Sequence, residues 1–220
     1  MKICSISIRD DINEDSLNTL MKRISPRRIS QIQKYKFWDD KKRTVYGELL
    51  LRFILSRDIG LKQKDIILDI DQNGKPYLRG ENGIHFNISH SGDYVVCAID
   101  RTPIGVDIEE IKKADLIVTK RIFSTSEQKR IISDDKSRDE LFFQYWTLKE
   151  SYSKYTGKGL RLPFSSISFT VNKDIYMESD YKDTVYFSSL KYKDKYWISV
   201  CTKEKNELEH VEQINIKDIL

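Results

Sequence analysis

The stretch Trp146-Thr147-Leu148-Lys149-Glu150-Ser151-Tyr152-Ser153-Lys154 is the part of the sequence from which the rest is interpreted. Its aromatic and aliphatic residues can anchor one side of a helix. Glu150 and Lys154 stand four residues apart, so their side chains share one face of that helix. The stretch therefore predicts a helix that presents a carboxylate and an ammonium side by side.

A second stretch, Ile104-Gly105-Val106-Asp107-Ile108-Glu109, predicts a strand that faces this helix. Asp107 and Glu109 are two residues apart, so both carboxylates point to one side of the strand and the apolar residues between them point to the other. Together with Glu150 they make three carboxylates beside the ammonium of Lys154. Such a group can hold a hard cation next to a phosphate, as phosphoryl transfer requires.

Each of these pairs is also common in proteins without a site. A Glu–Lys pair at this spacing most often supports a solvated helix by about 0.2–0.5 kcal/mol. Two alternating acids most often mark an exposed strand face. Only their combination favours a site.

The composition indicates a folded chain with a small excess of positive charge. The 220 residues include 38 Lys and Arg against 34 Asp and Glu, for a net charge of +4, and 39% are hydrophobic. This balance suits an acidic partner or a phosphorylated ligand but lacks the dense basic face of a duplex-binding protein. We expect no nucleic-acid partner.

The cysteines and the hydropathy pattern favour a cytoplasmic protein. Cys4, Cys97 and Cys201 are an odd, dispersed set, typical of reduced thiols. No apolar run approaches the roughly 18 residues of a membrane helix, so no membrane partner is expected.

The order of predicted elements repeats. Long helices near 41–58 and 138–155 each end at a Gly-Leu pair, and an apolar strand follows in each half, near 94–97 and 196–199. The repeat concerns element order rather than residues, and helix followed by strands is common enough for chance to produce it. We predict an α+β fold of two similar halves, residues 1–102 and 103–220, related by a pseudo-twofold axis with the active site in the cleft between them.

Other side chains are candidates for the lining of this cleft. Ser89 and His90 could bind a diphosphate, or could belong to an ordinary hairpin turn that bonds its own backbone. Lys75 follows Gly74 in a predicted turn and could reach a phosphate. Arg28 and Arg43 belong to a cationic cluster, which in most proteins is a solvated face.

Five motifs resemble the 4'-phosphopantetheinyl transferases. Gly105-Val106-Asp107-Ile108-Glu109 and the stretch from Trp146 to Lys154 are similar to the paired signature of that family. Three further motifs resemble its larger, monomeric class, which activates surfactin-type peptide synthetases: Asn73-Gly74-Lys75-Pro76-Tyr77, Phe86-Asn87-Ile88-Ser89-His90-Ser91 and Gly157-Lys158-Gly159 with Leu162-Pro163.

The resemblance implies a pseudo-dimer of two α+β halves with coenzyme A between them: a first half that binds coenzyme A and a second half that carries the metal site and the catalytic helix. It implies a monomer that transfers phosphopantetheine from coenzyme A to a serine hydroxyl of an apo carrier protein, acyl or peptidyl, and releases 3',5'-ADP. Such enzymes serve nonribosomal peptide or polyketide synthesis.

The resemblance also implies roles for individual residues. Mg2+, or alternatively Mn2+, would be held by three carboxylates: Asp107, Glu109 and Glu150. The coenzyme A phosphates would contact Ser89, His90, Lys75 and Lys154. The 3'-phosphate would contact Arg43 and Arg28, although a family lysine in that segment is replaced here by Gln31.

Two catalytic residues follow from the chemistry of this reaction. A serine hydroxyl is a poor nucleophile at neutral pH and benefits from a base. Glu150 could take its proton directly or through water, and Lys154 could neutralise or protonate the departing 3',5'-ADP. The acceptor is expected to bind near Lys112, Lys113, Lys120 and Arg121, with Leu116 and Phe123 fixing its register.

Two other functions use parts of the same pattern. Another Mg2+-dependent enzyme acting on nucleotides would need the carboxylates but no protein acceptor. A non-enzymatic module that binds coenzyme A or RNA would explain the cations, but would leave three carboxylates facing a phosphate ligand without a metal, which is electrostatically unfavourable.

Overall fold

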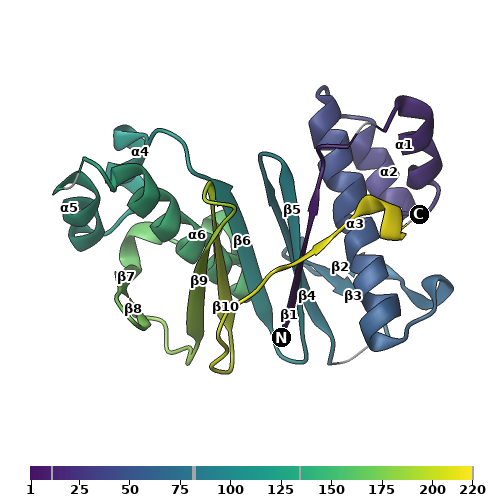
Figure 1. Cartoon of the computed structure of the whole chain (residues 1–220). Coiled ribbons are helices and arrows are strands. Elements are labelled where there is room, and N and C mark those ends of the chain that lie inside the picture. The colour runs from purple at the N-terminus through teal and green to yellow at the C-terminus, as the bar shows by residue number, and fades with distance from the viewer. Residues whose placement is uncertain (11, 81–82, 134, 220) are drawn as a thin grey trace.

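The computed structural model describes residues 1–10, 12–80, 83–133 and 135–219, and these form two adjoining α+β halves (Figure 1). The first half contains β1 (Lys2–Ser7), α1 (Glu14–Met21), α2 (Pro26–Ile32), α3 (Trp38–Ile59), β2 (Leu68–Ile70), β3 (Pro76–Leu78), β4 (His85–Ser91) and β5 (Tyr94–Asp100).

The rest of the chain forms the second half and then returns to the first. Its elements are β6 (Ile104–Glu110), α4 (Leu116–Ile122), α5 (Thr125–Ser133), α6 (Arg138–Thr156), β7 (Ser168–Val171), β8 (Ile175–Glu178), β9 (Tyr186–Tyr192), β10 (Tyr196–Thr202), β11 (Glu212–Ile214) and α7 (Ile216–Ile219). No helix of the described ranges has both the length and the apolar character needed to cross a bilayer.

Two sheets face each other at the centre, and each carries a long helix on its outer side (Figure 1). The first has the strand order β11-β1-β5-β4 and is covered by α3; the second has the order β6-β10-β9 and is covered by α6. An apolar core fills the space between the sheets. It includes Val96, Ala98, Val106, Ile108, Ile198 and Val200.

The C-terminal segment crosses from the second half to the first. Strand β11 pairs in parallel with β1, with Glu212 opposite Cys4. Ile214, Ile216 and Ile219 are buried in the core beneath α3. The last residues, which we expected in the second half, therefore lie on the sheet of the first, because that is where their apolar side chains leave water.

The hairpin turn considered for Ser89 and His90 is wrong, because both residues lie within strand β4. Its residues pair antiparallel with β5, Ser89 opposite Val96 and Ser91 opposite Tyr94. The chain turns only at Gly92, whose φ of 52° lies in the left-handed region that glycine adopts at little cost. The long helices predicted near 41–58 and 138–155 are confirmed as α3 and α6.

Helix α6 approaches strand β6 unusually closely at Gly105. A Cβ atom there would overlap the carbonyl oxygen of Ser151 and lie 2.5 Å from the backbone nitrogen of Tyr155. Only a residue without a side chain lets the helix lie this near the strand. The next residues of β6 on this face are Asp107 and Glu109, so the close approach sets their distance from the helix.

We therefore predict that Gly105→Ala lowers the free energy of unfolding by at least about 1–3 kcal/mol, because helix backbone must move to admit one methyl group. Urea denaturation measures this difference. Gly47→Ala in α3 is the matched control: its Cβ would meet side chains and no backbone, at 3.2 Å from Ile88 Cγ2 and 3.5 Å from Val95 Cγ1. Equal stabilities of the two variants would contradict the role given to Gly105.

Candidate active site

A pocket of about 400 Å³ lies where strands β4 and β6 and helix α6 meet. It brings together six of the predicted site residues, from both halves of the chain. Its lining residues are Ile88, Ser89, His90, Asp107, Glu109, Trp146, Glu150 and Lys154.

The position of the pocket is set by hydrogen bonds between side chains of β4 and strand β6. Asn87 Oδ1 accepts a hydrogen bond from the backbone nitrogen of Val106, at 2.9 Å. Ser89 Oγ donates to Asp107 Oδ1, and Ser91 Oγ donates to Glu109 Oε2, each at 2.7 Å. Because alternate residues of a strand share one face, β4 lays three polar side chains against β6 in register.

Asp107 is the most buried of the three carboxylates, with 2% of its surface exposed. Its Oδ1 accepts hydrogen bonds from Ser89 Oγ and from the Lys154 ammonium, whose nitrogen is 2.5 Å away. Its Oδ2 is buried and has no hydrogen-bond partner in the part of the chain that the structure describes. A buried carboxylate oxygen without a donor is costly, and a bound cation would satisfy it.

The other two carboxylates are destabilised in their charged form. Burial, and then the charge of Asp107, raise the pKa of Glu109 to about 7. The same two causes, in the same order, raise the pKa of Glu150. Near neutral pH the pocket therefore favours any cation that neutralises these groups.

The donor set fits a magnesium ion only in part. In residues 1–10, 12–80, 83–133 and 135–219, no group of three or more Asp, Glu, His or Cys side chains forms a metal cage. Mg2+ is usually bound by one or two carboxylates and completes its shell with waters and substrate phosphate. The unpartnered oxygen of Asp107 and its two carboxylate neighbours meet that lesser requirement.

Cations from both halves surround His90. Arg43 of α3 donates to the Gly92 carbonyl oxygen and to Asp40 Oδ1, both at 2.7 Å. Desolvation lowers the pKa of His90, and the charges of Arg43 and Lys154 lower it further. Burial and these two charges therefore favour the neutral form of the imidazole.

Three predicted ligand residues do not line the pocket: Arg43, Lys75 and Arg28. Lys75 is at the turn before β3, and its ammonium donates to backbone carbonyls at the end of α6 and at the start of β6. It lines an adjoining pocket of about 260 Å³ rather than the one that holds Asp107. Arg28, on α2, donates to Gln31 Oε1 at 3.1 Å and does not line the pocket.

Sequence reasoning missed the contacts of Ser91, Asn87 and Glu127. The signal for the first two was the spacing of Asn87, Ser89 and Ser91, which matches the alternation of Asp107 and Glu109 on the facing strand. Glu127 does accept from the Ser124 backbone, but its carboxylate also forms a fully buried ion pair with Lys149 at 2.8 Å. Nothing in the spacing of these two residues indicated that contact.

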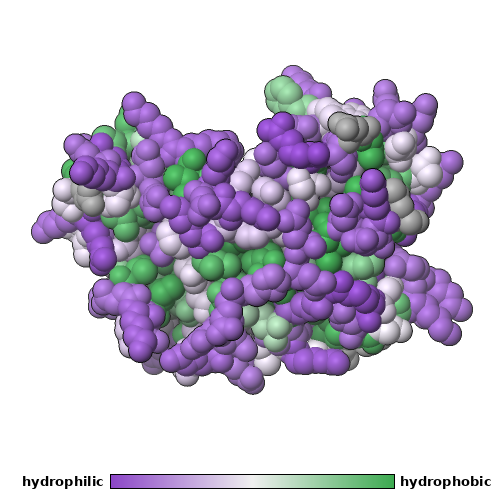
Figure 2. All heavy atoms as spheres, in the orientation of Figure 1, coloured by the Kyte–Doolittle hydropathy of each residue, from purple (hydrophilic) through white to green (hydrophobic). Residues whose placement is uncertain are grey.

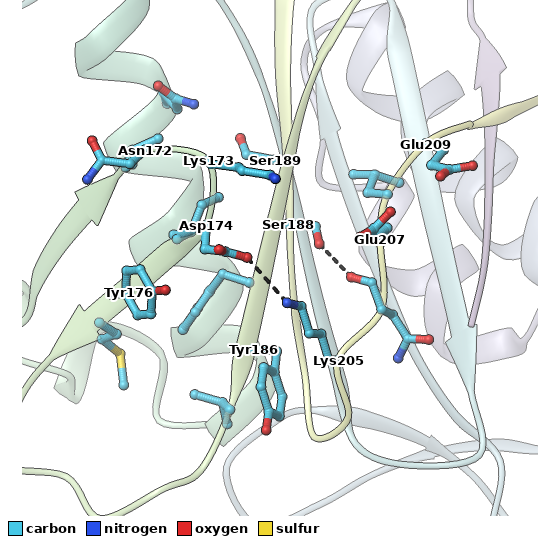
Figure 3. A pocket seen from close by; sticks show the side chains of 18 of the residues that line it. Asn172, Lys173, Asp174, Tyr176, Tyr186, Ser188, Ser189, Lys205, Glu207 and Glu209 are labelled. Carbon is cyan, nitrogen blue, oxygen red and sulfur yellow. Dashed lines mark hydrogen bonds and ion pairs between the residues drawn. The ribbon is translucent and has the colours of Figure 1, made fainter.

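A larger hollow, of about 540 Å³, lies elsewhere in the second half (Figure 3). It is bounded by the β7–β8 hairpin, strand β9 and the segment 205–209. An ion pair between Lys205 and Asp174, at 3.3 Å, spans it. None of the predicted site residues lines it, so size alone does not identify the site.

Models of known protein families match both halves of the chain. The model of the 4'-phosphopantetheinyl transferase superfamily matches residues 103–201, and the model of the N-terminal part of 4'-phosphopantetheinyl transferases matches residues 12–102. A holo-(acyl-carrier-protein) synthase from Bacillus anthracis, solved in complex with CoA (3',5'-ADP), covers 46% of this chain and 93% of its own, with 21% identity and a TM-score of 0.40.

Two relatives match along the whole chain. The 4'-phosphopantetheinyl transferase psf-1 of Bacillus pumilus is 34% identical, over 100% of this chain and 97% of its own. The 4'-phosphopantetheinyl transferase Sfp of Bacillus subtilis is 32% identical over 100% of both chains. The chain belongs to the 4'-phosphopantetheinyl transferase family.

Proposed function

We propose that this protein transfers the 4'-phosphopantetheine group from coenzyme A to a serine hydroxyl of an apo acyl or peptidyl carrier protein, releases 3',5'-ADP, and depends on Mg2+. The observation that carries the proposal is the junction pocket, in which three carboxylates and the Lys154 ammonium converge between two α+β halves. We also propose that these halves are related by a pseudo-twofold axis. Each contributes three strands that pair antiparallel, β1-β5-β4 and β6-β10-β9, and one long outer helix, which supports this relation.

Asp107, Glu109 and Glu150 would hold the metal ion. When bound, Mg2+ or Mn2+ supplies a positive charge that stabilises the diphosphate as negative charge builds on the leaving phosphate. The unpartnered Oδ2 of Asp107 and the raised pKa of Glu109 support this assignment, because an unsatisfied carboxylate oxygen and a carboxylate destabilised by burial are each stabilised by a bound cation.

Lys154, Ser89 and His90 would bind the diphosphate of coenzyme A. The donors of Lys154 and Ser89 already meet at Asp107: the Lys154 ammonium lies 2.8 Å from Ser89 Oγ and 2.5 Å from Asp107 Oδ1. Arg43, whose charge reaches His90, would bind the 3'-phosphate, with Arg28 as a second contact from α2. The phosphates of coenzyme A would then meet cations from both halves of the chain, Arg43 from the first and Lys154 from the second.

Glu150 would act as the base. Its raised pKa makes the carboxylate a better proton acceptor than an ordinary glutamate, because burial and the charge of Asp107 disfavour its ionised form. Lys154, one turn along α6, would neutralise or protonate the leaving phosphate. Both side chains come from one rigid helix, so their separation is fixed before substrate binds.

The acceptor would bind beside α4. Leu116 and Ile117 are exposed there, by 44% and 70%, and Figure 2 shows hydrophobic side chains among hydrophilic ones over this helix. Phe123, which we expected in this surface, is buried against Phe142 instead. Several cations lie near these residues: Lys112, Lys113, Lys120 and Arg121. An acidic carrier protein is the partner that such a surface would attract.

The proposal includes a monomeric, cytoplasmic protein without nucleic-acid or membrane partners. Its three cysteines are free and buried, which supports a reducing compartment.

Mass spectrometry of an apo carrier protein incubated with the enzyme, coenzyme A and Mg2+ tests the proposal. A gain of one phosphopantetheine group on the carrier is expected. Release of a nucleotide without this gain would favour another Mg2+-dependent nucleotide phosphotransferase. Binding of coenzyme A or RNA without turnover would favour a non-enzymatic module.

We predict that Asp107→Ala lowers kcat/KM by about 100-fold or more, because the metal loses a ligand and the lysine its partner. The melting temperature without metal should fall, because the variant loses the hydrogen bond from Ser89 and the ion pair with Lys154. Relief of the repulsion between Asp107 and its two neighbouring carboxylates offsets only part of that loss. Mg2+ should stabilise the wild type and no longer stabilise the variant.

The matched control for this prediction is Glu110→Ala, which removes the next acid on β6 but none from the pocket. It should keep both turnover and the stabilisation by Mg2+. Wild-type transfer that survives exhaustive chelation of divalent metal would contradict the prediction.

A further prediction concerns the 3'-phosphate. Arg43→Ala should weaken coenzyme A by about ten- to a hundredfold, the cost of one charge-assisted contact, and should weaken 3'-dephospho-coenzyme A far less. Calorimetric titration with both ligands measures this. Arg57→Ala, near the other end of α3, is the control, because Arg57 pairs with Asp58 and Glu212. Equal losses for the two ligands would assign Arg43 to folding.

A further inference from the structure

Lys75 reaches from the hairpin of the first half to the end of the helix that carries Glu150 and Lys154. We propose that Lys75 is a positioning residue: its ammonium fixes the last turn of α6 against the start of β6, and so holds the Lys154 side chain in the junction pocket. The proposal rests on the proposed function for what Lys154 and Glu150 do. The contacts of Lys75 are independent of that function.

The ammonium of Lys75 is fully used by backbone carbonyls. It donates to Lys154 O at 2.6 Å, to Tyr155 O at 3.1 Å and to Ile104 O at 3.4 Å. An ammonium has three N–H groups, and these are three acceptors. No donor remains for a phosphate while these contacts persist.

A cation stabilises a helix most at its C-terminal end. The last four carbonyls of a helix lack partners within it, and the helix dipole makes this end negative. Helix α6 ends at Gly157, which adopts a left-handed conformation with φ of 69°. The Lys75 side chain packs at this residue, its Cδ 3.6 Å from where a Cβ on Gly157 would lie. Lys75 is therefore a capping group supplied by the other half of the chain.

The turn that carries Lys75 is itself held firmly. Asp71 Oδ1 accepts hydrogen bonds from the backbone nitrogens of Asn73, at 2.8 Å, and Lys75, at 2.9 Å. Asn73 Oδ1 in turn accepts a hydrogen bond from Arg161, which follows α6. The turn is therefore hydrogen-bonded to the chain both before and after the C-terminal end of α6.

The contacts of Lys75 also involve residues of the junction pocket. Lys154 offers its carbonyl to Lys75 and its ammonium to Asp107 and Ser89. Ile104, whose carbonyl is the third acceptor, begins the strand that carries Asp107 and Glu109. One half-buried cation thus joins the backbones of the two elements that supply the pocket's charges. A shift of about 1 Å there can cost up to about a hundredfold in rate.

Lys75→Met, which keeps the apolar stem and removes the charge, tests the proposal. Two measurements are made on the full-length protein: steady-state kinetics with coenzyme A and apo carrier protein, and hydrogen exchange of the amides in the last turn of α6. Arg79→Met is the matched control, because Arg79 lies on the same hairpin and pairs with Asp69 without touching the second half. Lys75→Arg restores a cation that can donate to carbonyls.

We expect Lys75→Met to lower kcat by about tenfold while KM for coenzyme A stays within about twofold, and to speed exchange of the last turn of α6 by about tenfold. Lys75→Arg should recover part of kcat and of the exchange protection, which keeps the test valid if Lys75→Met folds poorly. Arg79→Met should match the wild type in both measurements.

A rise in KM for coenzyme A with unchanged kcat and unchanged exchange would overturn the proposal and make the ammonium a ligand contact. Unchanged exchange in Lys75→Met would overturn it whatever the kinetics. If the wild type transferred no phosphopantetheine, the proposed function would fail, yet the exchange comparison would still decide whether Lys75 holds the helix.

Discussion

The structure depends on the side-chain hydrogen bonds between two edge strands, β4 and β6. Each lies at the edge of its own sheet, and the two sheets share no strand. Asn87 binds the backbone of Val106, and Ser89 and Ser91 bind the carboxylates of Asp107 and Glu109. The groups that join the halves are therefore the groups that line the pocket, so the site cannot be separated from the joint.

The same contacts concentrate negative charge in a partly buried place. The chain offsets only part of it, through the Lys154 ammonium on Asp107 Oδ1, and leaves Oδ2 without a donor. Glu109, with a pKa near 7 from burial and from Asp107, shows the remaining cost. Binding of a cation together with a phosphate would stabilise such a pocket. The cation would neutralise the carboxylates, and the phosphate would neutralise the remaining positive charge.

Much of this arrangement could be predicted from the sequence, and the rest could not for physical reasons. The spacing of Glu150 and Lys154, and of Asp107 and Glu109, predicts one shared face each, and the pocket brings those faces together. Strand β4 was mistaken for a turn, because Asn and Ser bond their own backbone in turns as readily as they bond a neighbouring strand. The contact of Lys75 with Lys154 joins residues 79 positions apart, and no local pattern encodes it.

The central claim is that the three carboxylates at the junction bind the catalytic metal together with coenzyme A. Crystals grown with Mn2+ and coenzyme A test it most directly, through anomalous difference density from the metal. We predict one strong peak at coordination distance from Asp107, Glu109 or Glu150, with the Asp107 Oδ2 atom among its ligands and the diphosphate completing the shell. A metal bound elsewhere, or a pocket that holds coenzyme A while Lys154 alone neutralises Asp107, would contradict the account.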